Sequence, residues 1–88
     1  MFYVYFLKSK KNGKYYVGST HCLEIRLKGH NAGKVRSTKG LVPHEFVYAE
    51  KCLTKHAARM REFEIKKRKS RRYIETLIHG KQQETTFQ

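Results

Sequence analysis

The N-terminal residues carry the hydrophobic pattern of two strands joined by a tight turn. Residues 2–7 form an unbroken run of aromatic, β-branched and aliphatic side chains, which is typical of a buried strand. Asn12-Gly13 follows in a polar segment and favours a hairpin turn, after which residues 15–17 resume the apolar pattern. The sequence therefore predicts an antiparallel hairpin, followed by a turn at residues 18–20 that supplies a helix-capping hydroxyl.

Helical spacing begins after this turn. Leu23 and Leu27 lie four residues apart, which predicts a helix from residue 22 to about residue 31, with Gly33 as its stop. Residues 33–44 are basic and contain two glycines and a proline. We therefore expect a basic loop between this helix and the next element.

The second half of the chain predicts one more strand and two helices. Residues 45–49 alternate as a strand does, Thr54 can cap a helix over residues 55–68, and a shorter helix is predicted from Ser70 to about Ile78. The order is ββαβαα, which indicates an α+β fold with a small three-stranded antiparallel sheet flanked by helices. At 88 residues there is room for one domain, which we expect over residues 1–80, with residues 81–88 as a polar tail.

The charge of the chain indicates what kind of partner the protein binds. Twenty Lys and Arg residues against seven acids leave a net charge of +13, which favours binding to polyanions. A membrane partner is not expected, because the sequence has no long apolar run and no strongly amphipathic terminal helix. The expected partner is nucleic acid, DNA foremost, and no obligate protein partner is evident. Two cysteines without metal-ligand spacing, in a chain with no signal peptide, predict a cytoplasmic location.

The acidic residues restrict the possible metal chemistry. All seven are Glu, so active sites that gather two or three Asp around paired metals are excluded. A metal site would depend on one Glu, with water and phosphate oxygens completing the shell. Residues 54–72 carry nine basic side chains and two acids, Glu62 and Glu64. A helical wheel places Glu64 within the apolar arc that contains Met60, and Glu62 at its border, while an ion pair of Glu62 with Lys66 is equally compatible with the pattern.

Four further residues are candidates for phosphodiester chemistry. Strand alternation places Tyr5 and Tyr16 on one face of adjacent strands, with their hydroxyls close together. A phenol acts as a base only beside cations or a metal-bound water, and tyrosine is also simply a favourable strand residue. Arg26 and His30 are spaced i, i+4, so an arginine that can hold a phosphate and a histidine that can move a proton share one helix face at the margin of the core. An ordinary exposed basic helix face would show the same spacing.

Ordered motifs connect these candidates. Tyr3-Val4-Tyr5, followed ten residues later by Tyr16-Val17-Gly18, resembles the paired motif of the GIY-YIG nuclease superfamily. The match continues through the helix that carries Arg26 and His30, reaches Glu62, and covers about residues 2–75. It is most similar to stand-alone, single-domain members related to the N-terminal nuclease domain of the excision-repair protein UvrC.

The resemblance implies a metal-dependent endonuclease that uses one divalent cation, Mg²⁺ or Mn²⁺, to hydrolyse DNA in repair, recombination or processing. It implies that Tyr16 lies near the attacking water as its general base or orienter, and that Tyr5 supports this site by hydrogen bonding. It also implies that His30 helps to handle the proton of the water, and that Arg26 contacts the scissile phosphate. It also favours Glu62 over Glu64 as the metal ligand. The residues predicted to contact nucleic acid are Gly18, Lys34, Arg36, Lys39, Arg59, Lys66 and Lys67.

Two positions depart from the family pattern. Tyr3 stands where the first motif has glycine, and Cys22 stands where related sequences often have Asp, so capping of the first helix is expected to be weaker. Two other interpretations remain open: a non-catalytic nucleic-acid-binding protein with the same fold, and a small ribosome-associated basic protein.

Overall fold

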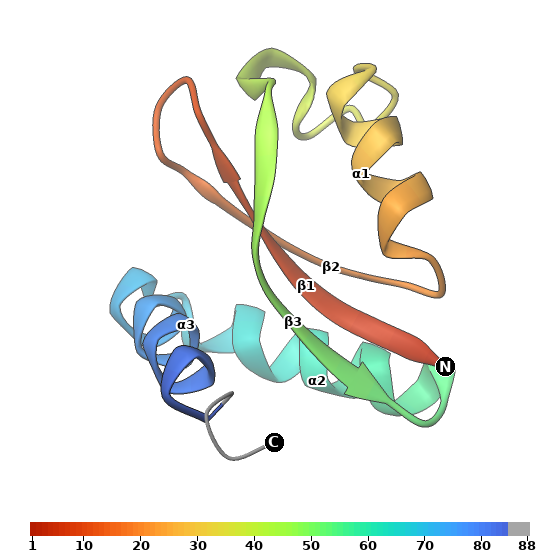
Figure 1. Cartoon of the computed structure of the whole chain (residues 1–88), viewed down its shortest axis with the longest axis vertical. Coiled ribbons are helices and arrows are strands. Elements are labelled where there is room, and N and C mark those ends of the chain that lie inside the picture. Colours follow the sequence, from red (N-terminus) through yellow and green to blue (C-terminus); the bar gives the residue numbers. More distant parts are fainter. Residues whose placement is uncertain (85–88) are drawn as a thin grey trace.

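The computed structural model describes residues 1–84 and confirms the predicted α+β order ββαβαα. Figure 1 shows one sheet, with α1 on one side and α2 and α3 on the other. A short 3-10 helix, η1, precedes the third strand. The elements are β1 (Phe2–Ser9), β2 (Tyr15–Thr20), α1 (Leu23–Asn31), η1 (Lys39–Leu41), β3 (His44–Cys52), α2 (Lys55–Arg68) and α3 (Arg71–Glu84).

The sheet is antiparallel, with strand order β2-β1-β3. Tyr5, in the central strand, pairs with Gly18 of β2 on one side and with Ala49 of β3 on the other. The register against β3 shifts between Phe6 and Leu7. Because β2 pairs only with β1 in this sheet, its outer edge is open, and this edge becomes important for the site.

The hairpin forms as predicted, but β2 is longer than its hydrophobic pattern indicated. Gly13 has a φ of 76°, a conformation that glycine adopts readily, and it allows the turn. The predicted turn at residues 18–20 is wrong, because all three residues pair with β1 and the chain turns only at His21. α1 then begins after Cys22, whose side chain makes no capping hydrogen bond, as the sequence led us to expect.

The last two helices differ in how well their sequence predicted them. α2 has the predicted bounds, and the Thr54 hydroxyl accepts a hydrogen bond from the Ala57 N–H. α3 was predicted to end near residue 78 but runs to Glu84. The helix thus crosses residue 80, where the domain was predicted to end, and that domain boundary stays a prediction. Of the predicted tail, residues 85–88 lie outside the described part of the chain.

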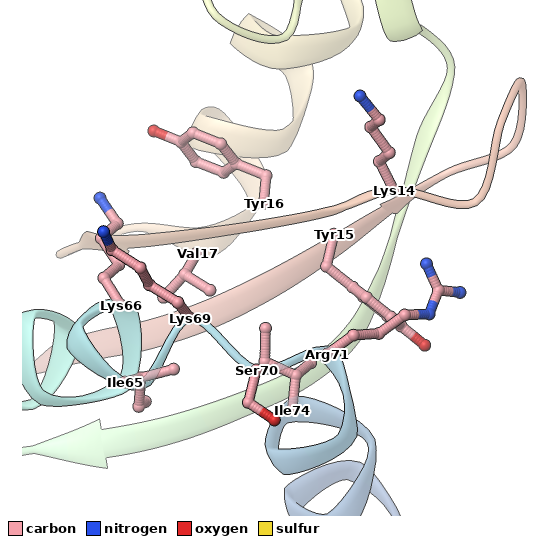
Figure 2. Close-up of a pocket in the computed structure, with 10 residues that line it drawn as sticks. All are labelled: Lys14, Tyr15, Tyr16, Val17, Ile65, Lys66, Lys69, Ser70, Arg71 and Ile74. Atoms are coloured by element: carbon pink, nitrogen blue, oxygen red, sulfur yellow. The ribbon is translucent and has the colours of Figure 1, made fainter.

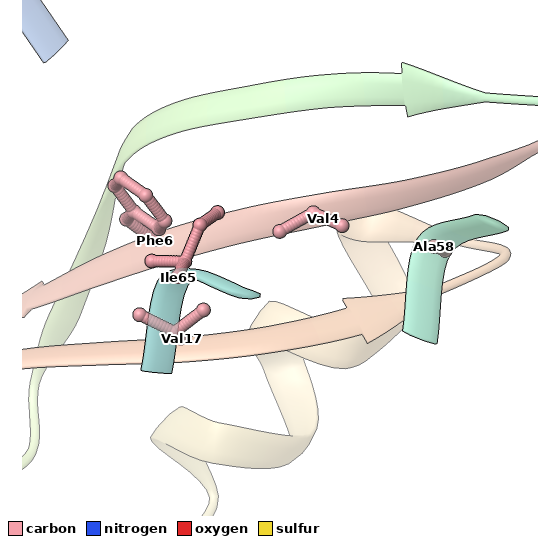
Figure 3. Close-up of a cluster of buried hydrophobic side chains, with 5 residues drawn as sticks. All are labelled: Val4, Phe6, Val17, Ala58 and Ile65. Carbon is pink, nitrogen blue, oxygen red and sulfur yellow. The ribbon is translucent and has the colours of Figure 1, made fainter. Parts of the chain in front are cut away.

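The core lies between the sheet and α2. Val4, Phe6 and Val17 of the sheet pack against Ala58 and Ile65 of α2, and all five are buried (Figure 3). Each large aliphatic or aromatic side chain buried in this way stabilises the fold by about 1.5–3 kcal/mol. The partly buried apolar side chains of α3 that complete this layer are Tyr73, Ile74, Leu77 and Ile78.

Successive residues of β1 point to opposite faces of the sheet. Val4 and Phe6 face α2, and Tyr5 and Leu7 face the α1 side; all four are completely buried. β1 is therefore fixed from both faces, and a side chain on it, such as Tyr5, is held in a defined position.

Two global features bear on the setting of the protein. No helix in the described residues combines the length and the apolar character needed to cross a membrane. Cys22 and Cys52 are free thiols, located before α1 and at the end of β3.

Candidate active site

Tyr5 lies at the centre of the candidate site. Its hydroxyl accepts a hydrogen bond from Arg26 Nε at 3.2 Å and lies 2.9 Å from His30 Nε2. The Tyr16 ring lies 6.2 Å from the Tyr5 ring and 4.7 Å from the His30 ring, between centroids. The predicted pairing of the two tyrosines on one face is thus confirmed, and α1 brings Arg26 and His30 onto the same face.

Gly18 makes this cluster sterically possible. A Cβ atom at this position would lie 2.7 Å from the Tyr5 hydroxyl oxygen and 2.9 Å from Cε2 of Tyr16, which are distances that real Cβ atoms do not adopt. Gly18 is itself buried. The space above its Cα is filled by the protein's own phenols, so this placement gives no support to the predicted contact between Gly18 and nucleic acid.

The hydrogen bonds of His30 define its tautomer. Thr38 Oγ1 lies 3.3 Å from the Val35 carbonyl oxygen and 2.8 Å from His30 Nδ1, and its one proton can serve only one of them. Donation to the carbonyl makes the hydroxyl the acceptor of Nδ1–H. Nε2 is then the unprotonated nitrogen and accepts from the Tyr5 hydroxyl. The ring is completely buried rather than at the margin of the core, and both nitrogens are engaged. This position does not allow direct contact with an attacking water.

Burial also fixes the protonation of these two residues. Loss of solvation is the main cause that lowers the pKa of His30 to about 4, with the charges of Arg26 and His44 contributing. Loss of solvation also raises the pKa of Tyr5 to about 12, although the hydrogen bond from Arg26 acts in the opposite direction. At neutral pH both side chains are therefore uncharged, and Tyr5 links Arg26 to His30 as a protonated phenol.

Arg26 connects the buried cluster to the surface. Its side chain is exposed, and the hydrogen bond to Tyr5 raises the pKa of the guanidinium further above its ordinary value. Nε makes the bond to Tyr5, and a hydrogen bond with Tyr16 also raises the pKa of the guanidinium. The group therefore bonds both phenols and keeps further N–H donors for a phosphate. A permanently charged donor is thus held in a fixed orientation beside Tyr16.

Glu62 reaches the same region from the other side of the sheet. It lies on α2, and its Oε1 accepts a hydrogen bond from the hydroxyl of Ser19, the residue after Gly18 on β2, at 2.9 Å. Its Oε2 accepts from Lys66 Nζ at 2.6 Å, and this ammonium lies 5.9 Å from the centroid of the Tyr16 ring. The open edge of β2 is therefore where the carboxylate from α2 and the phenol of Tyr16 come near each other.

The structure distinguishes Glu62 from Glu64. The Glu62 side chain is 21% exposed and the Glu64 side chain 57% exposed, and Glu64 bonds an arginine one turn earlier in α2. The arc predicted from the helical wheel was wrong, since Met60 is 54% exposed while Ala58 and Ile65 are buried. The buried face of α2 is thus rotated toward Glu62, which directs this side chain toward β2.

The donor set fits one kind of metal ion. Among residues 1–80, no group of three or more His, Cys or Glu side chains could hold a metal, so a site of zinc type with four protein ligands is not built. The Glu62 carboxylate and the Ser19 hydroxyl offer hard oxygen donors at one point. They fit a cation such as Mg²⁺ or Mn²⁺, which takes most of its ligands from water and substrate phosphates.

The predicted nucleic-acid contacts on α2 lie on both sides of Glu62. Arg59 shares a cleft of about 260 Å³ with Arg26, Ser19 and Lys55 at the end of β2. Lys66 bonds Glu62, which is the ion pair that the sequence pattern also allowed. Lys67 is exposed on the same helix. The cleft places two guanidinium groups from different elements beside the hydroxyl that contacts Glu62.

The predicted contacts in the basic loop form a second group. Lys34 lines a cleft of about 580 Å³ that also includes Arg26, while Arg36 and Lys39 are exposed. Figure 1 shows this loop beside α1, on the opposite side of the sheet from α2. The sheet therefore separates the two groups of cations. Arg26 lines the cleft that contains Lys34 and also the cleft that contains Arg59.

Sequence analysis missed Ser19 and Thr38. Ser19 had a detectable signal, because it follows the second motif directly and points to the face of β2 opposite Gly18. Thr38 had none, since it lies in an irregular loop eight residues from His30 and only the folded chain brings the two together. Lys55, in the cleft with Arg59, was counted among the basic residues of α2 but not selected.

Comparison with known proteins places the chain in a domain family. The family model of the GIY-YIG catalytic domain matches residues 1–74. The chain is 45% identical over 65 residues to a UPF0213 protein of Staphylococcus haemolyticus, covering 73% of this chain and 78% of the relative. It is 37% identical over 84 residues to the UPF0213 protein YazA of Bacillus subtilis, covering 91% and 84%.

A solved relative has the same architecture. The solution NMR structure of a UPF0213 protein from Bacillus halodurans superimposes with a TM-score of 0.55 at 36% identity, covering 90% of this chain and 84% of the other. The cluster around Tyr5, the second tyrosine motif and the carboxylate on α2 all lie within the matched family model. The chain therefore belongs to the GIY-YIG family, a nuclease family whose members generally use divalent metal ions.

Proposed function

We propose that this protein is an endonuclease that hydrolyses phosphodiester bonds in DNA with one divalent cation, Mg²⁺ or Mn²⁺, held at Glu62. The observation that carries the proposal is the meeting of three elements at the open edge of β2. Arg26 comes from α1, Tyr16 from β2 itself, and Glu62 from α2. A hydrolase needs a phosphate-binding cation, a group that positions water and a metal ligand within one site, and these residues supply the three.

Arg26 is proposed to bind the non-bridging oxygens of the scissile phosphate through its remaining N–H donors. Tyr16 is partly exposed and is the phenol placed to orient the attacking water. Glu62 would hold the divalent cation, whose charge would stabilise the negative charge that develops on the leaving oxygen. The resulting arrangement favours in-line attack, with the water and the leaving oxygen on opposite sides of the phosphorus.

His30 and Tyr5 are proposed to act as positioning residues. Sequence analysis assigned His30 to the proton of the attacking water, but its complete burial supports an indirect role. The chain of bonds from Thr38 through His30 and Tyr5 to Arg26 fixes the guanidinium that meets the phosphate. The alternative of a nucleic-acid-binding protein without catalysis does not require this fixed orientation.

The distribution of positive charge supports a polyanionic substrate. Arg59 and Lys66 lie beside the candidate site, and the loop containing Lys34, Arg36 and Lys39 extends the basic surface around α1. Each phosphate contact releases counterions, so DNA affinity is expected to fall steeply as the salt concentration rises. The proposed setting is DNA repair, recombination or processing in the cytoplasm.

A cleavage panel tests the proposal. Purified protein is incubated with labelled single-stranded, duplex and branched DNA and with RNA, in Mg²⁺, in Mn²⁺ and in EDTA, and binding is measured in parallel. We expect cleavage of at least one DNA form with either metal, and binding without cleavage in EDTA. Binding of all forms without cleavage in either metal would instead identify a non-catalytic nucleic-acid-binding protein.

A further inference from the structure

A second pocket lies beside the candidate site, between β2 and the junction of α2 and α3. It has a volume of about 410 Å³, and Figure 2 shows cationic side chains around it. These are Lys14, Lys66, Lys69 and Arg71, and no acidic residue lines the pocket. The site proposed for hydrolysis shares Lys66 and Tyr16 with this pocket. It does not use Lys14, Lys69 or Arg71, so these three cations are not explained by it.

Two of these cations have no anionic partner among the side chains of residues 1–80. Arg71 Nε bonds Glu75 at 3.2 Å, and Lys66 bonds Glu62. In the part of the chain whose side chains are described, neither Lys14 nor Lys69 has an acidic group within 4 Å. The pocket therefore carries uncompensated positive charge, which favours an anionic occupant.

The backbone at Lys69 has a conformation that is unusual for lysine. Its φ is 49°, so a lysine occupies the left-handed conformation that ends α2, where glycine or asparagine is favoured. This conformation costs a residue with a Cβ about 1 kcal/mol. Lys69 lines the pocket, so the residue that holds this conformation is also one of the cations of the pocket.

The remaining lining is apolar and aromatic. Val17, Ile65 and Ile74 contribute aliphatic carbon, and the Tyr15 ring is held in place by its hydroxyl, which donates to Glu75 at 3.2 Å. The Arg71 guanidinium carbon lies 4.8 Å from the centroid of this ring. A bare inorganic anion would not use such a surface. A phosphate joined to a sugar and a flat base would use both the cationic and the apolar parts of the lining.

We propose that this pocket binds one nucleotide unit. The phosphate is held by Lys66 and Lys69, and the sugar and base lie against Tyr15 and the aliphatic floor. Lys14 lies beyond Tyr16 along β2 and adds positive charge at the rim (Figure 2). Lys66 bonds Glu62 and also lines the pocket, so the two sites adjoin. The further statement that this nucleotide neighbours the cleaved phosphate rests on the proposed endonuclease function, whereas binding of the nucleotide does not.

Titration of the full chain with small ligands tests the pocket without any cleavage. The ¹H–¹⁵N spectra are recorded in EDTA with a nucleoside monophosphate, the matching nucleoside and inorganic phosphate. We expect the monophosphate to shift the amides of residues 14–17 and 65–71 and to bind at least about tenfold more tightly than either fragment. Tighter binding of a trinucleotide would identify a nucleic-acid strand as the source, and equal binding would identify a free nucleotide.

Lys69→Gly is the decisive variant. Glycine adopts a positive φ without strain, so the substitution removes the ammonium group while the thermal stability stays the same or increases. We expect at least about fivefold weaker binding of the monophosphate, corresponding to roughly 1 kcal/mol. Lys51→Ala removes an exposed charge on β3, away from the pocket, and should leave binding within about twofold.

Three results would overturn the proposal. They are unchanged affinity for the monophosphate in Lys69→Gly, amide shifts confined to other parts of the chain, and equal affinity for inorganic phosphate and the monophosphate. Because the titration contains no metal, nucleotide binding by a protein that cleaves no DNA would refute the endonuclease and retain the pocket. Cleavage of DNA by a protein that binds no nucleotide in this pocket would support the endonuclease and refute the nucleotide pocket.

Discussion

At the level of single residues, the Tyr5 hydroxyl occupies the space that a side chain at position 18 would need. The glycine of the second motif thus serves the packing of two phenols rather than the approach of a substrate. The same hydroxyl donates to His30 and accepts from Arg26, so its one proton is used inside the protein. Both contacts depend on the ring remaining close to the β2 backbone.

Gly18→Ala should therefore disturb the cluster. The new methyl group would displace the Tyr5 or Tyr16 ring, and overpacking of this kind lowers the free energy of unfolding by about 1–3 kcal/mol. Gly29→Ala on α1 is the matched control, because nothing lies within 4 Å of its added Cβ, and it should raise stability by about 0.5–1 kcal/mol. Urea unfolding of both variants tests this, and a Gly18→Ala protein as stable as the parent would contradict it.

Thr38 controls the direction of the hydrogen bonds that end at Arg26. Thr38→Val should leave the buried Nδ1–H of His30 without an acceptor and lower stability by about 1–3 kcal/mol. Long-range ¹H–¹⁵N spectra should show the proton on Nδ1 in the parent and in Thr38→Ser, and a mixture of tautomers in Thr38→Val. A proton on Nε2 in the parent would show that the proposed bond directions are wrong.

At the level of elements, α2 must be held at a fixed angle for Glu62 to reach β2. Arg61 fastens this helix, because Nε and one terminal nitrogen each bond a carboxylate oxygen of Glu50 on β3 at 2.9 Å. The Arg61 side chain also bonds Glu64 and the hydroxyl of Tyr73 on α3. The side chains of Arg61 and Glu50 are 26% and 23% exposed, so solvent screens this pair less than a surface pair.

Arg61→Ala should lower the free energy of unfolding by about 1–3 kcal/mol, because it removes the two-bond charged contact between α2 and β3 and the bond to Tyr73 of α3. A double-mutant cycle with Glu50→Gln should give a coupling energy of about 1–2 kcal/mol. Arg72→Ala, at an exposed arginine of α3, should change stability by less than about 0.5 kcal/mol. A coupling energy near zero would show that this pair does not fasten α2.

The elements also show what the sequence can predict and what it cannot. The hairpin and α2 follow from local signals, namely the Asn12-Gly13 turn, the strand alternation and the Thr54 cap. The extension of β2 through Thr20 depends on pairing with β1, and the length of α3 depends on packing against the core. Both depend on contacts between distant parts of the chain, so local sequence patterns do not predict them. The family motifs pointed to Tyr5, Arg26 and Glu62, whereas the contacts through Thr38 and Ser19 needed the folded chain.

At the level of the whole molecule, burial of His30 makes stability depend on pH. The pKa of His30 is lowered to about 4 from its ordinary value of 6.5, so below pH 6.5 the unfolded chain binds more protons than the folded one. The His30 contribution to stability is therefore present above about pH 6.5 and is lost as the pH falls toward 4. Urea unfolding between pH 7 and pH 4.5 should show this decrease, and His30→Asn should have a flatter profile. Parallel profiles would contradict the assignment.

The chain has a net charge of +13, and two of its basic groups lie on opposite sides of one sheet, while the Glu62 carboxylate bonds Ser19 of the edge strand. Binding of DNA can come from the cations alone, since phosphate contacts dominate such affinity. Cleavage cannot, because it needs a metal ligand beside Arg26 and Tyr16. Comparing binding with cleavage in variants of the two acids of α2 therefore separates the two functions.

The most direct measurement compares Glu62→Gln with Glu64→Gln in Mg²⁺-dependent DNA cleavage and in DNA binding. Glu62→Gln keeps the size of the side chain and its bond with Ser19 but loses the anionic oxygen, so we expect at least about 100-fold slower cleavage with affinity within about threefold. Glu64→Gln, at the more exposed acid, should cleave at nearly the parent rate. Parent-like cleavage by Glu62→Gln in a preparation free of contaminating nucleases would contradict the account.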